Sequence, residues 1–277
     1  MGLILHKIYE NECRFEYEEI NNEKAYDSLW EGIDLLNYDL LEAEIIFKEL
    51  IKQYPFYIDA YNHLSIAFKY QNKFFESFIT AEKSYNIGRT LILNNFNFKT
   101  DKLEYYDIKN RPYYRSCHNY ALELQEAGKH HEAIKICDET QLLNKSDNLG
   151  LRYLSLESNF AINNLVGIRK LLKSNKDDWS IDFMYAKVNL EIISGNLEKA
   201  KLYLTNAIKD NTFLPDLIIN FKKIAAAHGI KDDQFNFELV SRGSFEEAYE
   251  YWKGYQSFYK RKEILDFYKK YSKTLLF

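Results

Sequence analysis

Three histidines and two cysteines lie close together near the middle of this 277-residue chain, and imidazole with thiolate is a zinc-binding combination. They are His118, His130 and His131, with Cys117 and Cys137. A zinc site needs four converging ligands, usually at short local spacing. Helical spacing instead turns both cysteines toward a core, where a free thiol packs as a small apolar group. We therefore expect no metal here, and we expect His130 and His131 to lie in a turn that faces solvent.

Two acidic pairs, Asp177-Asp178 and Asp232-Asp233, are the other residues with metal-binding chemistry. Each precedes a helical segment, where carboxylates stabilise the positive end of the helix dipole, and no matching ligand set accompanies either pair. The sequence contains no glycine-rich nucleotide loop, no HExxH motif and no GxSxG elbow. We expect a protein that is not an enzyme and that needs no cofactor.

The composition indicates helices as the elements that position these residues. The chain has only 10 glycines and 3 prolines, compared with 23 tyrosines and 19 phenylalanines. Because tight turns depend on glycine and proline, this composition argues against a turn-rich β architecture. A hydrophobic content of 46% with 28% charged residues is typical of a folded globular chain. Most of the aromatic side chains fall at core positions of helices, so we interpret them as packing mass rather than as stacking platforms.

A short phrase recurs along the chain and predicts helical hairpins. It places a glycine five residues before an alanine, with Glu between: Gly128-Lys-His-His-Glu-Ala133, Gly195-Asn-Leu-Glu-Lys-Ala200 and Gly243-Ser-Phe-Glu-Glu-Ala248. The glycine suits the tight turn that ends one helix, and the small alanine lets the next helix pack closely. Apolar residues at helical spacing flank each phrase, so each should mark the turn of a hairpin.

The pattern resembles the tetratricopeptide repeat, whose unit is about 34 residues. Ala43, Phe47, Leu50 and Pro55 have the spacing of its second helix, and the segment 59–68 has that of the first helix of the next repeat. We place repeats at 24–57, 58–91, 114–147, 148–180 and 181–214, an insertion at 92–113 and a divergent C-terminal hairpin at 238–275. The resemblance implies an all-α fold, a right-handed superhelix of antiparallel helical hairpins.

A narrower resemblance covers the C-terminal half. The run Asn144-Lys-Ser-Asp147-Asn148-Leu-Gly150-Leu-Arg152-Tyr153 is similar to a phrase of bacterial tetratricopeptide proteins without an assigned function. The segment from Gly243 to Trp252 is similar to the C-terminal part of the suppressor-of-tumorigenicity-seven group. Neither group supplies catalytic residues to transfer to this chain.

We expect residues 1–277 to form one continuous domain, because no linker rich in Pro, Gly or Ser interrupts the array. Residues 1–22 carry Leu5, Ile8 and Phe15 among glutamates, which fits an amphipathic N-terminal capping helix. The N-terminus lacks a signal-peptide core, no apolar run could span a membrane, and three cysteines without paired spacing fit a reducing compartment. These features predict a cytoplasmic protein.

The resemblance also implies a binding groove lined by the first helix of each repeat. Carried onto this chain, the groove positions are Asp59, Asn62, Lys69, Tyr70, Arg115, His118, Asn119, Gln125, Arg152 and Asn159. Lys, Arg and Asn from neighbouring repeats resemble the clamp that holds a peptide's C-terminal carboxylate in some family members. The leading hypothesis is therefore a protein–protein interaction scaffold with a peptide or protein segment in its concave groove.

The alternative hypothesis rests on the C-terminal segment 251–277, where seven basic residues against two acidic ones give +5 within a chain of net charge −4. Aromatic residues alternate with these charges, as in a basic amphipathic helix that binds nucleic acid or an anionic surface. A capping helix with solvated lysines explains the same pattern. The net negative charge of the whole chain argues against nucleic acid as the main partner. An enzyme that uses the His and Cys group is a third hypothesis.

Overall fold

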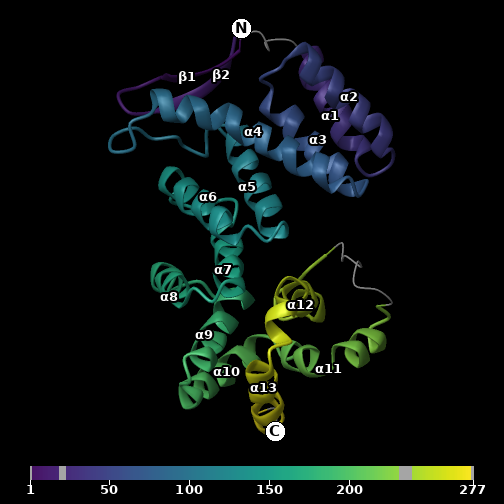
Figure 1. The fold of residues 1–277 in the computed structure, drawn as a ribbon, viewed down its shortest axis with the longest axis vertical. Coiled ribbons are helices and arrows are strands. Elements are labelled where there is room, and N and C mark those ends of the chain that lie inside the picture. The colour runs from purple at the N-terminus through teal and green to yellow at the C-terminus, as the bar shows by residue number, and fades with distance from the viewer. Residues whose placement is uncertain (1, 19–22, 231–238, 276–277) are drawn as a thin grey trace. The chain divides into compact units, whose positions relative to one another are not determined.

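The structure, a computed structural model, describes residues 2–18, 23–230 and 239–275, and within these it forms thirteen helices and two strands (Figure 1). Neighbouring helices pack against each other along the chain, as in a helical repeat. The contacts between residues divide the chain into two compact units, Met1–Ser158 and Asn159–Phe277. The sequence predicts one continuous domain over the same residues. The two units are described separately below.

The first unit contains three helical hairpins that coincide with the first three predicted repeats. In each hairpin the two helices pack against one another because the turn between them is short. The pairs are α1 (Glu23–Leu35) with α2 (Leu40–Gln53), α3 (Ile58–Tyr70) with α4 (Phe74–Asn95), and α5 (Arg111–Glu126) with α6 (His130–Leu143). Ala43 and Ala133, the predicted small residues of the second helices, are fully buried, so the close approach that the phrase predicts is confirmed.

The described residues 2–18 do not form the capping helix that we predict for 1–22, because β1 (Leu3–Lys7) and β2 (Cys13–Tyr17) form an antiparallel hairpin with Leu5 opposite Phe15. Leu3 and Leu5 on β1, and Cys13 and Phe15 on β2, are buried, which is the alternation of a strand with one face on a core. Burial therefore alternates with a period of two along each strand, whereas the apolar residues of this segment were interpreted as one face of a helix.

The predicted insertion, 92–113, serves as the partner of this hairpin. Helix α4 continues to Asn95, and the connection from there to α5 runs along β2, where the amide of Cys13 donates to the carbonyl of Lys102 at 2.8 Å. The buried side chain of Asn110 accepts from the amide of Phe15 at 3.0 Å and donates to the carbonyl of Cys13 at 3.1 Å. The insertion thus anchors the N-terminal hairpin to the first unit.

The turns of four hairpins share one backbone geometry, although two of them lack the predicted glycine. Gly128 and Gly195 have φ of +73° and +78°, and Asn72 and Asn163 occupy the same place at +59° and +56°. In each turn the next residue donates its amide to a carbonyl five residues earlier, which is the Schellman closure of a helix. Asparagine tolerates this left-handed conformation better than other non-glycine residues, so the repeat is more regular than the glycines alone predicted.

The second unit continues the series of helices. The boundary between the units falls within α7 (Leu151–Ala161), and the second unit then has α8 (Leu165–Ser174), α9 (Ile181–Ile193), α10 (Leu197–Asp210), α11 (Leu214–Ala227), α12 (Phe245–Tyr259) and α13 (Lys262–Leu275). Gly243 has φ +74° and immediately precedes α12, whereas α11 was not among the predicted elements. The fourth and fifth predicted repeats correspond to α7 with α8 and to α9 with α10.

A buried polar network joins the C-terminal helices to α9. The side chain of Asn189 is fully buried; it donates to the hydroxyl of Tyr259 at 2.8 Å and accepts from that of Tyr268 at 3.0 Å. Trp252, Tyr255 and the other aromatic residues of α12 are also buried. These aromatic side chains of 251–277 therefore pack within the unit, as a capping role requires. None of the helices in the described part of the chain combines the length and apolar character needed to cross a bilayer.

Candidate functional site

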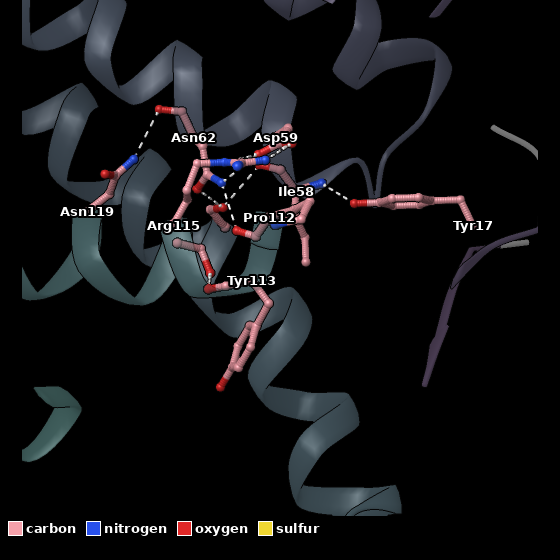
Figure 2. Close-up of polar contacts among 10 residues, drawn as sticks. Tyr17, Ile58, Asp59, Asn62, Pro112, Tyr113, Arg115 and Asn119 are labelled. Carbon is pink, nitrogen blue, oxygen red and sulfur yellow. Dashed lines mark hydrogen bonds and ion pairs between the residues drawn. The ribbon is translucent and has the colours of Figure 1, made fainter. Parts of the chain in front are cut away.

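The predicted groove residues of α3 and α5 form a polar network that joins these two helices (Figure 2). Arg115 on α5 donates from Nε to Oδ1 of Asp59 on α3 at 3.0 Å and from Nη2 to Oδ2. Burial opposes the positive charge of Arg115, but the hydrogen bonds and the charge of Asp59 outweigh it and raise the arginine pKa. The guanidinium is thus committed to a carboxylate of its own chain.

Asn62, predicted to line the groove, is instead part of the interior. Its side chain is 1% exposed and donates to the carbonyl of Pro112 at 2.9 Å, while its oxygen accepts from the hydroxyl of Ser84 at 2.7 Å. Asn119 reaches the backbone carbonyl of Asn62 at 3.4 Å (Figure 2). These amides hold α3, α4 and α5 together, since buried polar groups need such partners.

Two further predicted residues, Lys69 and Gln125, are likewise engaged within the first unit. Lys69 contacts Glu126 at 2.7 Å and Glu123 at 3.4 Å. Gln125 is buried and donates to the carbonyl of Leu154 at 3.2 Å. Both side chains bridge neighbouring helices, which removes them from the predicted carboxylate clamp.

The remaining predicted residues are Tyr70, His118, Arg152 and Asn159. Tyr70 is well exposed, and His118 is half-buried with its pKa lowered by burial. Arg152 lies over the ring of Tyr153 at 4.2 Å and pairs with the carboxylate of Asp147 at 2.9 Å.

Asn159 belongs to the second unit and is buried. Its oxygen accepts from the side chain of Asn164 at 2.7 Å. A Cβ at Gly167 would come within 1.9 Å of the same oxygen. Glycine stands where the repeat pattern has alanine because Asn159 fills the space, so Asn159 is a packing residue of α7 and α8.

A different pocket, of about 730 Å³, opens beside the Arg115–Asp59 pair in the first unit. We call it the first-unit pocket. Its walls come from β2, the first helix of each of the three hairpins and the end of the insertion. Tyr26 and Trp30 on α1 line it and are 57% and 48% exposed, with their rings in an edge contact at 5.9 Å. Exposed aromatic side chains at a pocket mouth are the usual anchors of protein recognition.

The sequence predictions missed Tyr26 and Trp30 because aromatic residues were assigned to the core as a class. Their spacing contains the signal that could have identified them. Each follows a buried residue, Ala25 or Leu29, by one position, so the two aromatics form a second stripe turned about 100° from the core stripe. A helix with one buried stripe and an adjacent aromatic stripe has an apolar surface available for a partner.

Two of the three cations that line the first-unit pocket, Lys109 and Arg115, are paired with carboxylates of the chain, and the third, Arg111, contacts only neutral groups in the described contacts, whereas two of the pocket's carboxylates are exposed. Lys109 pairs with Glu16, and Arg111 donates to the carbonyl of Tyr105 at 3.2 Å and lies over its ring. The carboxylates of Glu23 and Asp27 line the opening on α1 and are exposed. The arrangement favours a positively charged group above the Tyr26 and Trp30 rings over a carboxylate clamped by Arg115.

His63 supplies a polar group that faces the same pocket. Its Nδ1 is buried and has no hydrogen-bond partner among the described residues, and its ring stacks on Phe47. Burial lowers the pKa of His63, which keeps the ring neutral near pH 7. His63 therefore adds no charge to the first-unit pocket.

The two cysteines of the predicted histidine and cysteine group pack in the core. Cys117 and Cys137 are fully buried, as predicted, and burial raises the pKa of the Cys117 thiol to about 11. The prediction that His130 and His131 lie in the turn is wrong, because they are the first two residues of α6; His131 is exposed, whereas His130 is half-buried.

Within the described part of the chain, no cluster of three or more His, Cys, Asp or Glu side chains could hold a metal ion. Asp178 accepts from the amide of Ser180, the N-cap of α9, and Asp232-Asp233 lies outside the described residues. Comparison with known proteins adds no assignment: no family model matches the sequence, and no curated protein matches it.

Proposed function

We propose that this chain is a non-enzymatic interaction scaffold of the tetratricopeptide type, with its hairpins in a right-handed superhelix, and that it acts in the cytoplasm. Its first-unit pocket would bind a peptide segment of another protein. The observation that supports the proposal is the exposed pair Tyr26 and Trp30 at a pocket built from successive first helices. In helical repeats, first helices are the elements that present the binding surface.

The charges of the pocket favour a basic peptide. A Lys or Arg side chain of the partner can lie over the Trp30 or Tyr26 ring and approach Glu23 and Asp27, which gains both cation–π and charge attraction. This proposal replaces the predicted carboxylate clamp, whose Arg115, Lys69 and Arg152 are paired with carboxylates of the chain itself.

The test is a selection of random peptides displayed on phage against the full chain, followed by calorimetric titration of the enriched sequences. We expect enrichment of peptides that contain Lys or Arg. Tyr26→Ala with Trp30→Ala should weaken their binding about tenfold or more, as loss of aromatic anchors does. The control Phe74→Ala with Phe75→Ala removes two aromatics of α4 that are more exposed than Tyr26 and Trp30 and that do not line the pocket, and it should leave affinity within about twofold of the wild type.

A second pair of variants tests the charge of the ligand. Glu23→Lys with Asp27→Lys should abolish binding of the selected basic peptides. Glu31→Lys with Asp34→Lys changes two exposed carboxylates of the same helix that do not line the pocket, and should preserve most of the affinity. Failure to enrich any basic peptide, or equal losses in both members of a pair, would contradict the proposal.

A further inference from the structure

The second unit contains a pocket of about 800 Å³ between α11 and the helices α12 and α13. We call it the second-unit pocket. Its apolar lining includes Ile219, Phe221 and Leu265, and the ring of Phe221 is stacked on that of Trp252 with centroids 3.6 Å apart. The volume is that of a site for a bulky side chain and its neighbours, not of a packing defect.

A kink in α11 builds this pocket. Six consecutive residues, from Ile218 to Lys223, all line it. In a regular α-helix each residue turns by about 100°, so six in a row would point around the full circumference and could not line one pocket. Asn220 departs from helical geometry with φ −139° and ψ 44°, and this break lets residues on both sides of it face the same space.

The charged residues that line the second-unit pocket all have the same sign. They are Lys222, Lys223 and Lys260, and no carboxylate is among the described residues of the lining. Lys222 and Lys223 are exposed and adjacent to the apolar floor of Phe221, and Lys260 bonds only the neutral side chain of Gln256. An apolar floor with a basic rim complements an anionic ligand that also carries an apolar group.

We propose that the second-unit pocket binds an acidic peptide segment that inserts one bulky apolar side chain. The apolar side chain lies over Phe221 and Leu265, and the flanking carboxylates pair with Lys222, Lys223 and Lys260. A nucleic acid fits less well, because Trp252 is buried beneath Phe221 and offers no free face for stacking a base. This site is independent of the first-unit pocket and takes a peptide of opposite charge.

The test measures fluorescence anisotropy of labelled ten-residue peptides with the full chain. The probes carry Asp and Glu around a central Phe-Leu pair; matched probes replace the acids by Lys or the Phe-Leu pair by Ser-Ser. We expect binding of the acidic apolar probe, weakened about tenfold by either replacement and by Lys222→Glu with Lys223→Glu. The control Lys173→Glu with Lys176→Glu changes two exposed lysines of the same unit and the net charge equally, and should keep affinity within about twofold.

Three results would overturn this inference. They are no binding of the acidic apolar probe, equal losses in the two lysine pairs, or tighter binding of a ten-nucleotide single-stranded RNA than of the peptide. Circular dichroism of each variant separates loss of binding from loss of fold, and the retained affinity of the first-unit pocket for its basic peptides provides a second control.

Discussion

Arg115 and Asp59 lie 56 positions apart in the sequence, yet their side chains form a two-point ion pair that joins α3 to α5 across the insertion. The side chain of Asp59 is 10% exposed and that of Arg115 is 38% exposed. Asp59 also accepts from the side chain of Asn62 at 3.1 Å. The pair therefore holds one wall of the first-unit pocket in place, where a family resemblance had assigned Arg115 to a ligand.

This relationship predicts a strong energetic coupling between the two residues. In a double-mutant cycle, Asp59→Ala and Arg115→Ala should couple by about 1–3 kcal/mol, because Arg115→Ala leaves the largely buried carboxylate of Asp59 without its charged partner. The exposed pair Lys52 and Glu49 is the control and should couple by less than about 0.5 kcal/mol. Amide hydrogen exchange of α2, α3 and α5 gives the unfolding free energy of the first unit in each variant, from which the two coupling energies are calculated. Equal coupling energies in both pairs would show that the Arg115–Asp59 pair does not hold the pocket wall in place.

Glu44 predicts how the stability of the first unit depends on pH. Burial acts to raise the pKa of Glu44, but hydrogen bonds from Lys48, Lys73 and Gln71 outweigh it and lower the pKa from 4.5 to about 2. Since the folded state favours the ionised form, the stabilisation is complete above about pH 4.5 and is lost as the pH falls toward 2.

Glu44→Gln should therefore show a smaller loss of thermal stability between pH 6 and pH 3 than the wild type. Thermal unfolding followed by circular dichroism at several pH values measures this difference. Glu42→Gln, which changes an exposed neighbour on the same helix, should follow the wild-type profile. A Glu44→Gln profile parallel to that of the wild type would show that the three partners do not stabilise the carboxylate.

Gly128 and Asn72 occupy equivalent turn positions, and we predict that substituting them changes the stability of the first unit in opposite directions. Gly128→Ala should destabilise the first unit by about 1 kcal/mol through its positive φ alone, because a Cβ there meets no atom within 4 Å. Asn72→Gly should be neutral or stabilise by a few tenths of a kcal/mol, since glycine adopts φ of +59° without steric cost. Urea unfolding of the two variants measures both values, and a destabilising Asn72→Gly would argue against the equivalence of the turns.

Asn110 predicts a local effect on the N-terminal hairpin. Asn110→Ala removes the bonds to the amide of Phe15 and to the carbonyls of Cys13 and Glu104, and leaves these buried backbone groups without partners. We expect a loss of about 2–3 kcal/mol, with faster amide exchange concentrated in 3–17. Asn97→Ala, in the same connection, is the control. Exchange that rises equally in α1 and α2 would show that the residue does not act on the hairpin specifically.

The helical hairpins were predictable because a glycine turn, a small packing residue and helical spacing are local signals. The strand pair β1–β2 was not, because five-residue apolar segments fit either period until a partner surface exists. That surface comes from the insertion and from Tyr113, about 100 residues away. The groove residues were not predictable for a related reason. Repeat positions place Arg115 and Asn62 on first helices, but only the three-dimensional contacts show that Arg115 is bonded to Asp59 and that Asn62 is bonded to the carbonyl of Pro112.

Peptide binding by the first-unit pocket is best measured by amide hydrogen exchange in the presence of the basic peptide that binds most tightly in the phage selection. Exchange is measured on the full chain with and without the peptide at saturation. We expect slower exchange in 23–33, 57–63 and 108–115, the segments that surround the pocket, and clearly less slowing at the same peptide concentration when Tyr26→Ala with Trp30→Ala is present. Slowing confined to other segments, or slowing that these two substitutions leave unchanged, would show that the peptide does not bind in the first-unit pocket.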